Sequence, residues 1–170
     1  MTTAWLQRLF TRELAAFSAE LALFPEESQI WATLPGVSNS AGNLALHVSG
    51  NLQHFVGAVL GGTGYVRDRP LEFSARGLSR ATVITEIERT TQVIETVLPT
   101  LSEDVLAVEY PDVLGGLRIP TGLFVHHLAS HLAFHLGQAG YLRRILTGES
   151  RSSGAIELDA LRQVPPAADN

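Results

Sequence analysis

The sequence contains no cysteine. Disulfide bonds are therefore excluded, and so are thiolate metal ligands and a cysteine nucleophile. If this protein carries out thiol chemistry, the sulfur has to arrive on a small molecule.

Positive charge is scarce and is not clustered. The formal net charge is -5, and the nearest approach to a basic run is the pair Arg143 and Arg144. Binding to nucleic-acid phosphates relies on clustered lysine and arginine. We therefore expect no nucleic-acid partner.

Long apolar runs are also missing. No run approaches the ~20 residues that span a bilayer, and the stretch Met1 to Arg8 lacks a basic region followed by an apolar core. We expect no membrane association and a cytoplasmic location. Hydrophobic residues make up 45% of the 170 residues and charged ones 17%, which favours one domain with a well-filled core.

Apolar residues recur at helical spacing in four stretches, separated by segments rich in turn formers. These stretches cover residues 4–24, 40–60, 79–98 and 120–146. The pattern predicts an all-α four-helix bundle over residues 1–148 with long connections, followed by a tail over residues 149–170.

Local signals set the ends of these helices. Ser40 and Ser79 are placed to cap the second and third helices, and Gly148 follows the fourth. Residues 105–119 contain β-forming residues around a proline and a glycine pair, so a short hairpin before the last helix is one interpretation. That last helix is apolar nearly all round, which is typical of a helix in the middle of a bundle.

Three histidines, His127, His131 and His135, recur at intervals of four residues in the last helix. His131 and His135 are four residues apart, so they share one helix face and can hold one metal ion. His47, in an apolar setting on the second helix, can complete a site of three nitrogens. Three protein ligands with an open position are typical of a catalytic metal. We expect one divalent ion (Zn, Ni or Fe), because nitrogen ligands suit all of them.

Other polar side chains lie near these positions. His127 can replace His131 or His135 as a metal ligand, or it can line a pocket. Gln138 is three residues past His135 and can orient a ligand ring or a bound water, or only bond a neighbour in its helix. Asn43 and Asn51 flank His47 by one turn each and leave the same alternatives open.

Several catalytic patterns are missing. Leu132 follows His131, so the helix is not a His-Glu-x-x-His protease helix. No carboxylate lies on the ligand faces of the two helices, whereas a di-iron bundle needs several. The sequence also has no glycine-rich phosphate loop and no Gly-x-Ser-x-Gly elbow.

The run His131-Leu-Ala-Phe-His135-Leu-Gly-Gln138-Ala-Gly-Tyr-Leu-Arg-Arg144, together with His47 on the second helix, resembles the DinB-like superfamily, which includes YfiT-like proteins. The match is specific in helices two and four and extends to the whole chain in length and helix order. The resemblance implies an up-down-down-up bundle, a homodimer, and one divalent metal held by His47, His131 and His135. Characterised members include mycothiol-dependent isomerases and transferases of bacillithiol or similar thiols.

The resulting hypothesis is a metal-dependent transferase that joins a low-molecular-weight thiol, like bacillithiol or mycothiol, to a small electrophilic substrate. Arg67 and Arg69 are candidates to bind a carboxylate of the thiol cosubstrate. One alternative is a hydrolase in which the metal activates water. A second is a non-catalytic binding or structural protein, in which the ion only joins two helices or no ion binds.

Overall fold

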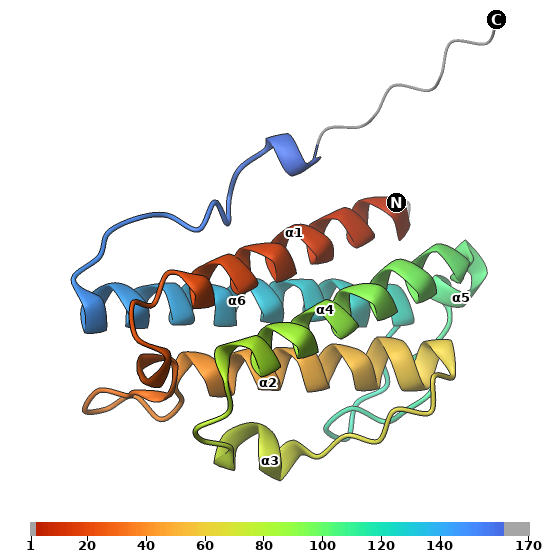
Figure 1. Cartoon of the computed structure of the whole chain (residues 1–170). Helices are drawn as coiled ribbons and strands as arrows, with labels where there is room; N and C mark the ends of the chain where they lie inside the picture. The colour runs from red at the N-terminus through yellow and green to blue at the C-terminus, as the bar shows by residue number, and fades with distance from the viewer. Residues whose placement is uncertain (1–2, 162–170) are drawn as a thin grey trace, which may run out of the picture.

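The computed structural model describes residues 3–161, which form helices and their connections (Figure 1). The all-α prediction is confirmed. The four long α-helices are α1 Thr3–Ala22, α2 Ala41–Leu52, α4 Arg80–Val97 and α6 Thr121–Thr147. Within the described part of the chain, no helix is both long enough and apolar enough to cross a bilayer.

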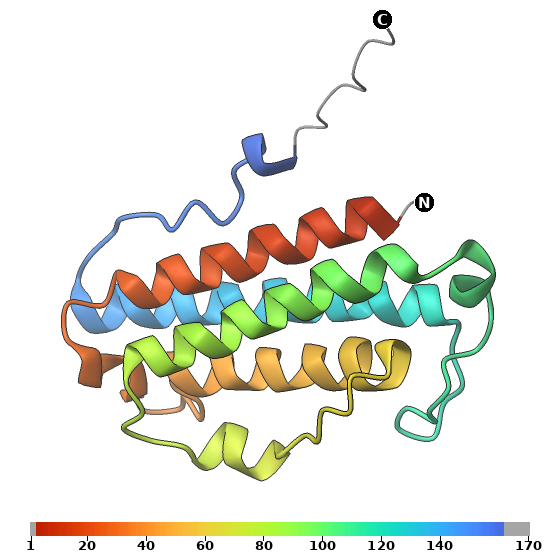
Figure 2. The same ribbon diagram turned by 45° about the vertical axis from the view of Figure 1, so that its right-hand side comes forward.

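The long helices pack as a bundle in which α1 and α2 each contact both α4 and α6. The chain runs in one direction along α1, in the opposite direction along α2 and α4, and back along α6 (Figures 1 and 2). This is the up-down-down-up order. Because α2 and α4 run the same way, the chain between them has to return along the bundle, which explains the long connection over residues 62–79.

The predicted helix ends are confirmed. The Ser40 hydroxyl accepts a hydrogen bond from the backbone N–H of Asn43, and Ser79 caps α4 in the same way. Gly148 ends α6 with a φ of 69°, a left-handed conformation that favours glycine. The second helix, however, changes form: after α2 it continues as a π-helix, η2 Gln53–Leu60. Such segments are rare and occur frequently at functional sites.

Two short helices lie in connections that the sequence pattern left unassigned. A 3₁₀ helix, η1 Glu27–Trp31, precedes α2, and α3 Arg69–Ser74 lies against α2 (Figure 2). The Asp68 carboxylate caps α3 by accepting from the Leu71 N–H, and a proline occupies its first turn. The connection between α2 and α4 therefore holds an ordered helix beside the centre of α2.

The hairpin expected within residues 105–119 forms only in part: the start of the segment is helical, and around Gly115 and Gly116 the chain turns back so that the backbones of Leu114 and Leu117 are hydrogen-bonded to each other. A 3₁₀ helix, η3 Leu98–Thr100, is followed by α5 Glu103–Ala107, whose cap is the Ser102 hydroxyl. Beyond α5 the chain forms only two isolated antiparallel bridges, Glu109 with Pro120 and Leu114 with Leu117. No residue between 3 and 161 lies in a strand.

The core is filled from all four long helices, with the phenylalanines of α1 among its largest fully buried side chains. The expectation that the last helix lies in the middle of the bundle is wrong. One side of α6 packs into the core, but several large apolar side chains on its other side are exposed: Leu123, Phe134, Tyr141 and Ile145.

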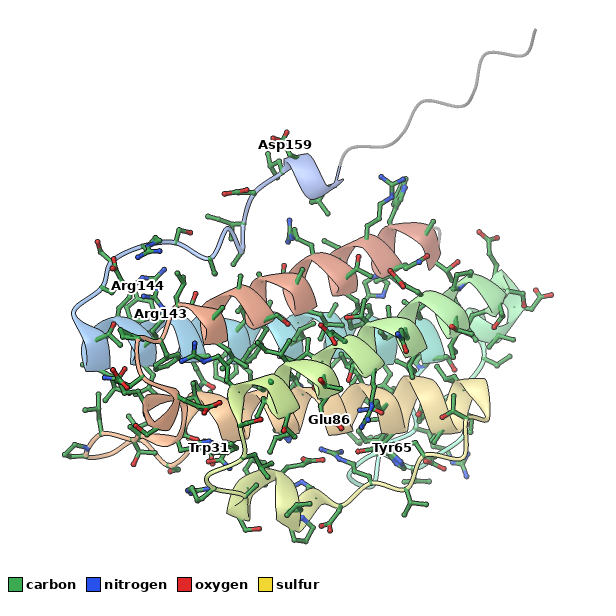
Figure 3. The ribbon with its side chains drawn as sticks, in the orientation of Figure 1. Trp31, Tyr65, Glu86, Arg143, Arg144 and Asp159 are labelled. Carbon is green, nitrogen blue, oxygen red and sulfur yellow. The ribbon has the colours of Figure 1, made fainter. Side chains whose placement is uncertain are left out.

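The segment after α6 is held by Arg143, which is fully buried where α1 and the end of α6 meet (Figure 3). Its guanidinium pairs with the buried Glu20 carboxylate of α1 and donates to the backbone carbonyls of Glu149 and Arg151. The chain then reaches a 3₁₀ helix, η4 Asp159–Leu161, which contacts α1. The rest of the predicted tail, 162–170, lies outside the described residues.

Candidate metal centre

Three histidine rings from two helices converge. The Nε2 atom of His131 lies 3.3 Å from Nε2 of His47 and 3.0 Å from Nε2 of His135. The three rings form a group whose ligand atoms all lie within 4.8 Å of one another, and His47 is buried while the other two are partly buried. The structure thus brings together the three residues that the spacing predicted, in an arrangement that can hold a metal ion.

The outer nitrogens of two of these rings have partners that accept hydrogen bonds. His47 Nδ1 lies 2.9 Å from the Glu72 carboxylate, and His135 Nδ1 lies 2.8 Å from Oε1 of Gln138. Both Nδ1 atoms therefore carry hydrogen, which leaves a lone pair on each Nε2 of a neutral ring. Since His131 Nε2 can donate at most one hydrogen, three ring nitrogens converge with at most one hydrogen among them.

The pKa values favour neutral rings. Burial, together with the neighbouring His135 and His47, lowers the pKa of His131 to about 4. Burial also lowers the pKa of His135, although its hydrogen bond with Gln138 opposes this shift. A neutral imidazole is the form that binds a metal, so protons compete weakly for these two rings at neutral pH.

The distances fit a metal ion. Two nitrogens bound to one tetrahedral zinc ion at ~2.05 Å lie about 3.3 Å apart. The two Nε2 distances of 3.0 and 3.3 Å are close to that value. The residues therefore fit a divalent ion with three nitrogen ligands.

The carboxylate beside this centre comes from α3, not from either ligand helix. Glu72 is buried and accepts hydrogen bonds from His47 and from Arg67, whose Nε lies 2.6 Å from Oε1. Burial alone would raise the pKa of Glu72, but these hydrogen bonds and the charge of Arg67 together lower it below its ordinary value. An ionised carboxylate that accepts from a ligand histidine fixes the tautomer and the orientation of the ring.

The position of Glu72 depends on a close approach between α3 and α2. A Cβ atom at Gly50 would overlap the Glu72 carboxylate, so only glycine leaves room for it there. The Asn43 amide, fully buried, donates to the backbone carbonyls of Glu72 and Ala75 at the end of α3. Asn43 thus holds α3 in place, and its side-chain hydrogen bonds are made with Ser40, Glu72 and Ala75.

Two other predicted residues lie near the centre with different surroundings. His127 is exposed, stacks on Phe124, and has its ring centroid 6.1 Å from that of His131. Asn51 is buried, and its Oδ1 atom has no hydrogen-bond partner. Neither belongs to the group of converging nitrogens.

The two arginines proposed for the cosubstrate differ in position. Arg67 lies at the centre, but its guanidinium is engaged with both oxygens of Glu72. Arg69 is exposed and lies over the ring of Phe73, and that ring packs against His47 at 4.8 Å between centroids. Of the two, Arg69 has the freer guanidinium for binding an anion.

Sequence reasoning missed Glu72 because no pattern connects it to the histidines. Glu72 lies 25 residues after His47, in a segment that reads as a connection between helices. The only local signal was that Asp68 and Pro70 can begin a helix.

No protein-family model matches the chain, and no curated protein or solved structure matches it either. The likeness to the DinB-like superfamily therefore rests on the histidine pattern and the helix order, and it stays a prediction.

Proposed function

We propose that this protein is a divalent-metal-dependent enzyme that transfers a low-molecular-weight thiol to a small electrophilic substrate. The observation that carries the proposal is the convergence of three histidine ring nitrogens, with a hydrogen-bonded partner on the outer nitrogen of two of the rings. His47, His131 and His135 would hold the ion. When bound, the ion supplies positive charge that lowers the pKa of a coordinated thiol.

The number of ligands supports a catalytic role over a structural one. Structural zinc sites almost always have four protein ligands, whereas catalytic sites have three and keep a position for substrate or water. The candidate centre offers three histidines among the described residues.

Two observations favour a thiol over water as the nucleophile. The chain has no cysteine, so an external thiol supplies a nucleophile that the protein lacks. Glu72, the carboxylate beside the centre, is bonded to Nδ1 of His47 and to Arg67, on the side of the ring opposite Nε2. It is therefore poorly placed to act as a general base on water, as a hydrolase would need.

The resemblance to the DinB-like superfamily points in the same direction, because thiol-dependent transferases occur there. We include the homodimer that this resemblance implies in the proposal. Arg69 is the better candidate to bind a carboxylate of the thiol, since Arg67 is paired with Glu72.

The test uses cobalt-substituted protein and a series of biological thiols, including bacillithiol and mycothiol. We expect one thiol to produce a sulfur-to-cobalt charge-transfer band, and the same thiol to be conjugated to a model electrophile such as chlorodinitrobenzene. Both signals should be lost in His135→Ala and retained in His54→Asn, which changes a histidine outside the group.

Absence of the band and of conjugation with every thiol would overturn the transferase proposal. Tight metal binding without either signal would instead support an ion that only joins α2 to α6.

A further inference from the structure

A second feature lies close to the histidines: a cavity of about 410 Å³ between the start of α2, the second half of α6 and the loop over residues 34–39. This volume falls within the range of small-molecule pockets, which is roughly 300–1,000 Å³. No residue described so far as part of the metal centre, apart from Gln138, lines it.

The cavity lies one helical turn from the histidines on both helices. Leu44 lines it and precedes His47 by three residues, while Gln138 lines it and follows His135 by three. Because α2 and α6 run in opposite directions, both steps lead toward the same end of the bundle (Figure 1). Three residues along an α-helix correspond to about 4.5 Å, so the cavity and the centre are neighbours.

Gln138 joins the two sites physically. Its Oε1 accepts the hydrogen bond from Nδ1 of His135, and its side chain also forms part of the cavity wall. A molecule in the cavity therefore contacts the same amide that orients a histidine of the centre.

The wall of the cavity indicates what it binds. All the side chains that line it are uncharged, and polar and apolar groups contribute about equally to the wall. The apolar side chains include Leu34, Val37, Tyr141 and Ile145 from the loop and from α6. Tyr141 and Ile145 are 73% and 64% exposed, so a bound apolar group would remove their surface from water. An ionised group would lose hydration there without gaining a charged partner.

We propose that this cavity binds the uncharged, apolar part of the electrophilic substrate and directs its reactive carbon toward the three histidines. This inference rests on the proposed function and adds the substrate class: a neutral molecule with an aromatic or branched alkyl group. Hydrogen-bonding groups of Ser38 and Asn39 at the same cavity suit a neutral polar substituent.

The test uses two related fluorescent probes, neutral N-phenyl-1-naphthylamine and its anionic counterpart 1-anilinonaphthalene-8-sulfonate. We expect saturable binding of the neutral probe and weaker binding of the anionic one. Ile145→Asp should weaken binding of the neutral probe by about tenfold or more, since it places a charge at the cavity wall. Leu123→Asp is the matched control, because Leu123 is 60% exposed on the same helix and does not line the cavity.

A second measurement tests the distance to the histidines. Cu²⁺ bound at the histidines should quench the fluorescence of the bound neutral probe, and His135→Ala should abolish the quenching without abolishing probe binding. Failure of the neutral probe to bind, equal loss in both aspartate variants, tighter binding of the anionic probe, or no quenching by bound Cu²⁺ would overturn the inference. If the wild-type protein binds the neutral probe but binds no Cu²⁺, the proposed function alone is overturned.

Discussion

At the scale of single residues, the centre depends on how each imidazole is oriented. A histidine on a helix face can rotate about its side-chain bonds, so shared spacing alone does not aim its nitrogens at one point. His47 is fixed by Glu72 and His135 by Gln138, each through Nδ1. These contacts leave both Nε2 atoms directed at His131.

Glu72→Gln tests this orientation. The substitution keeps the shape of the side chain but removes the charge that accepts from His47 and pairs with Arg67. Loss of such a partner of a ligand histidine typically lowers metal affinity by about 10–100-fold. We expect a loss in this range, measured by competition with a chromophoric chelator.

Glu86→Gln is the matched control for that measurement. Glu86 and Glu72 line the same cavity of about 280 Å³, whose wall also includes Tyr65 (Figure 3), but Glu86 pairs with Arg89 on α4. Its substitution should leave metal affinity unchanged. Equal affinities in both variants would show that Glu72 does not orient His47.

The histidines could be predicted from sequence and Glu72 could not, for a physical reason. The i,i+4 spacing of His131 and His135 fixes their shared face once the helix is recognised. Glu72 reaches His47 only because α3 folds back onto α2, which depends on Gly50 leaving space and on Asn43 bonding α3. Contacts of this kind are tertiary and leave no periodic signal.

At the scale of secondary-structure elements, α1 and α6 are joined by a buried ion pair. The side chains of Arg143 and Glu20 are 0% and 2% exposed. Removing one partner of a buried pair leaves an uncompensated charge and costs about 3–5 kcal/mol. We expect Glu20→Gln to lower the free energy of unfolding by this amount, measured by urea denaturation monitored by circular dichroism.

The double variant Glu20→Leu, Arg143→Met separates the charge from the packing. Replacement of both members of a buried pair by apolar residues is often neutral. The double variant should therefore recover most of the free energy of unfolding that Glu20→Gln loses. The recovery should be incomplete, because Met at position 143 cannot donate hydrogen bonds to the carbonyls of Glu149 and Arg151. A double variant as unstable as the single one would contradict an electrostatic origin of the loss.

Helix positions followed from periodicity, but helix type and short elements did not. The pattern over residues 40–60 predicts one helix, and the change to a π-helix at Gln53 alters the hydrogen bonding without altering which residues are apolar. α3 and α5 have six and five residues, too few for a helical period to appear. Segment 105–119 has β-forming residues, yet capping by Ser102 places its start in α5.

At the scale of the whole molecule, the candidate ion would connect parts of the chain that are far apart in sequence. His47 and His131 are separated by 84 residues and lie on α2 and α6, two helices that pack directly together. An ion bound there stabilises only the folded chain, because the three nitrogens do not converge when the helices separate.

Metal addition should therefore raise the melting temperature. At a free ion concentration of about 100 times Kd, the stabilisation is about 2.7 kcal/mol, which for a chain of this size raises Tm by about 5–10 °C. Differential scanning calorimetry of chelator-treated protein with and without added Zn²⁺ measures this shift. His131→Ala should abolish this shift, because it removes the nitrogen that lies within 3.3 Å of both other Nε2 atoms, whereas His54→Asn should preserve it. If wild-type protein melts at the same temperature with and without every divalent ion tested, the histidines do not form a metal site.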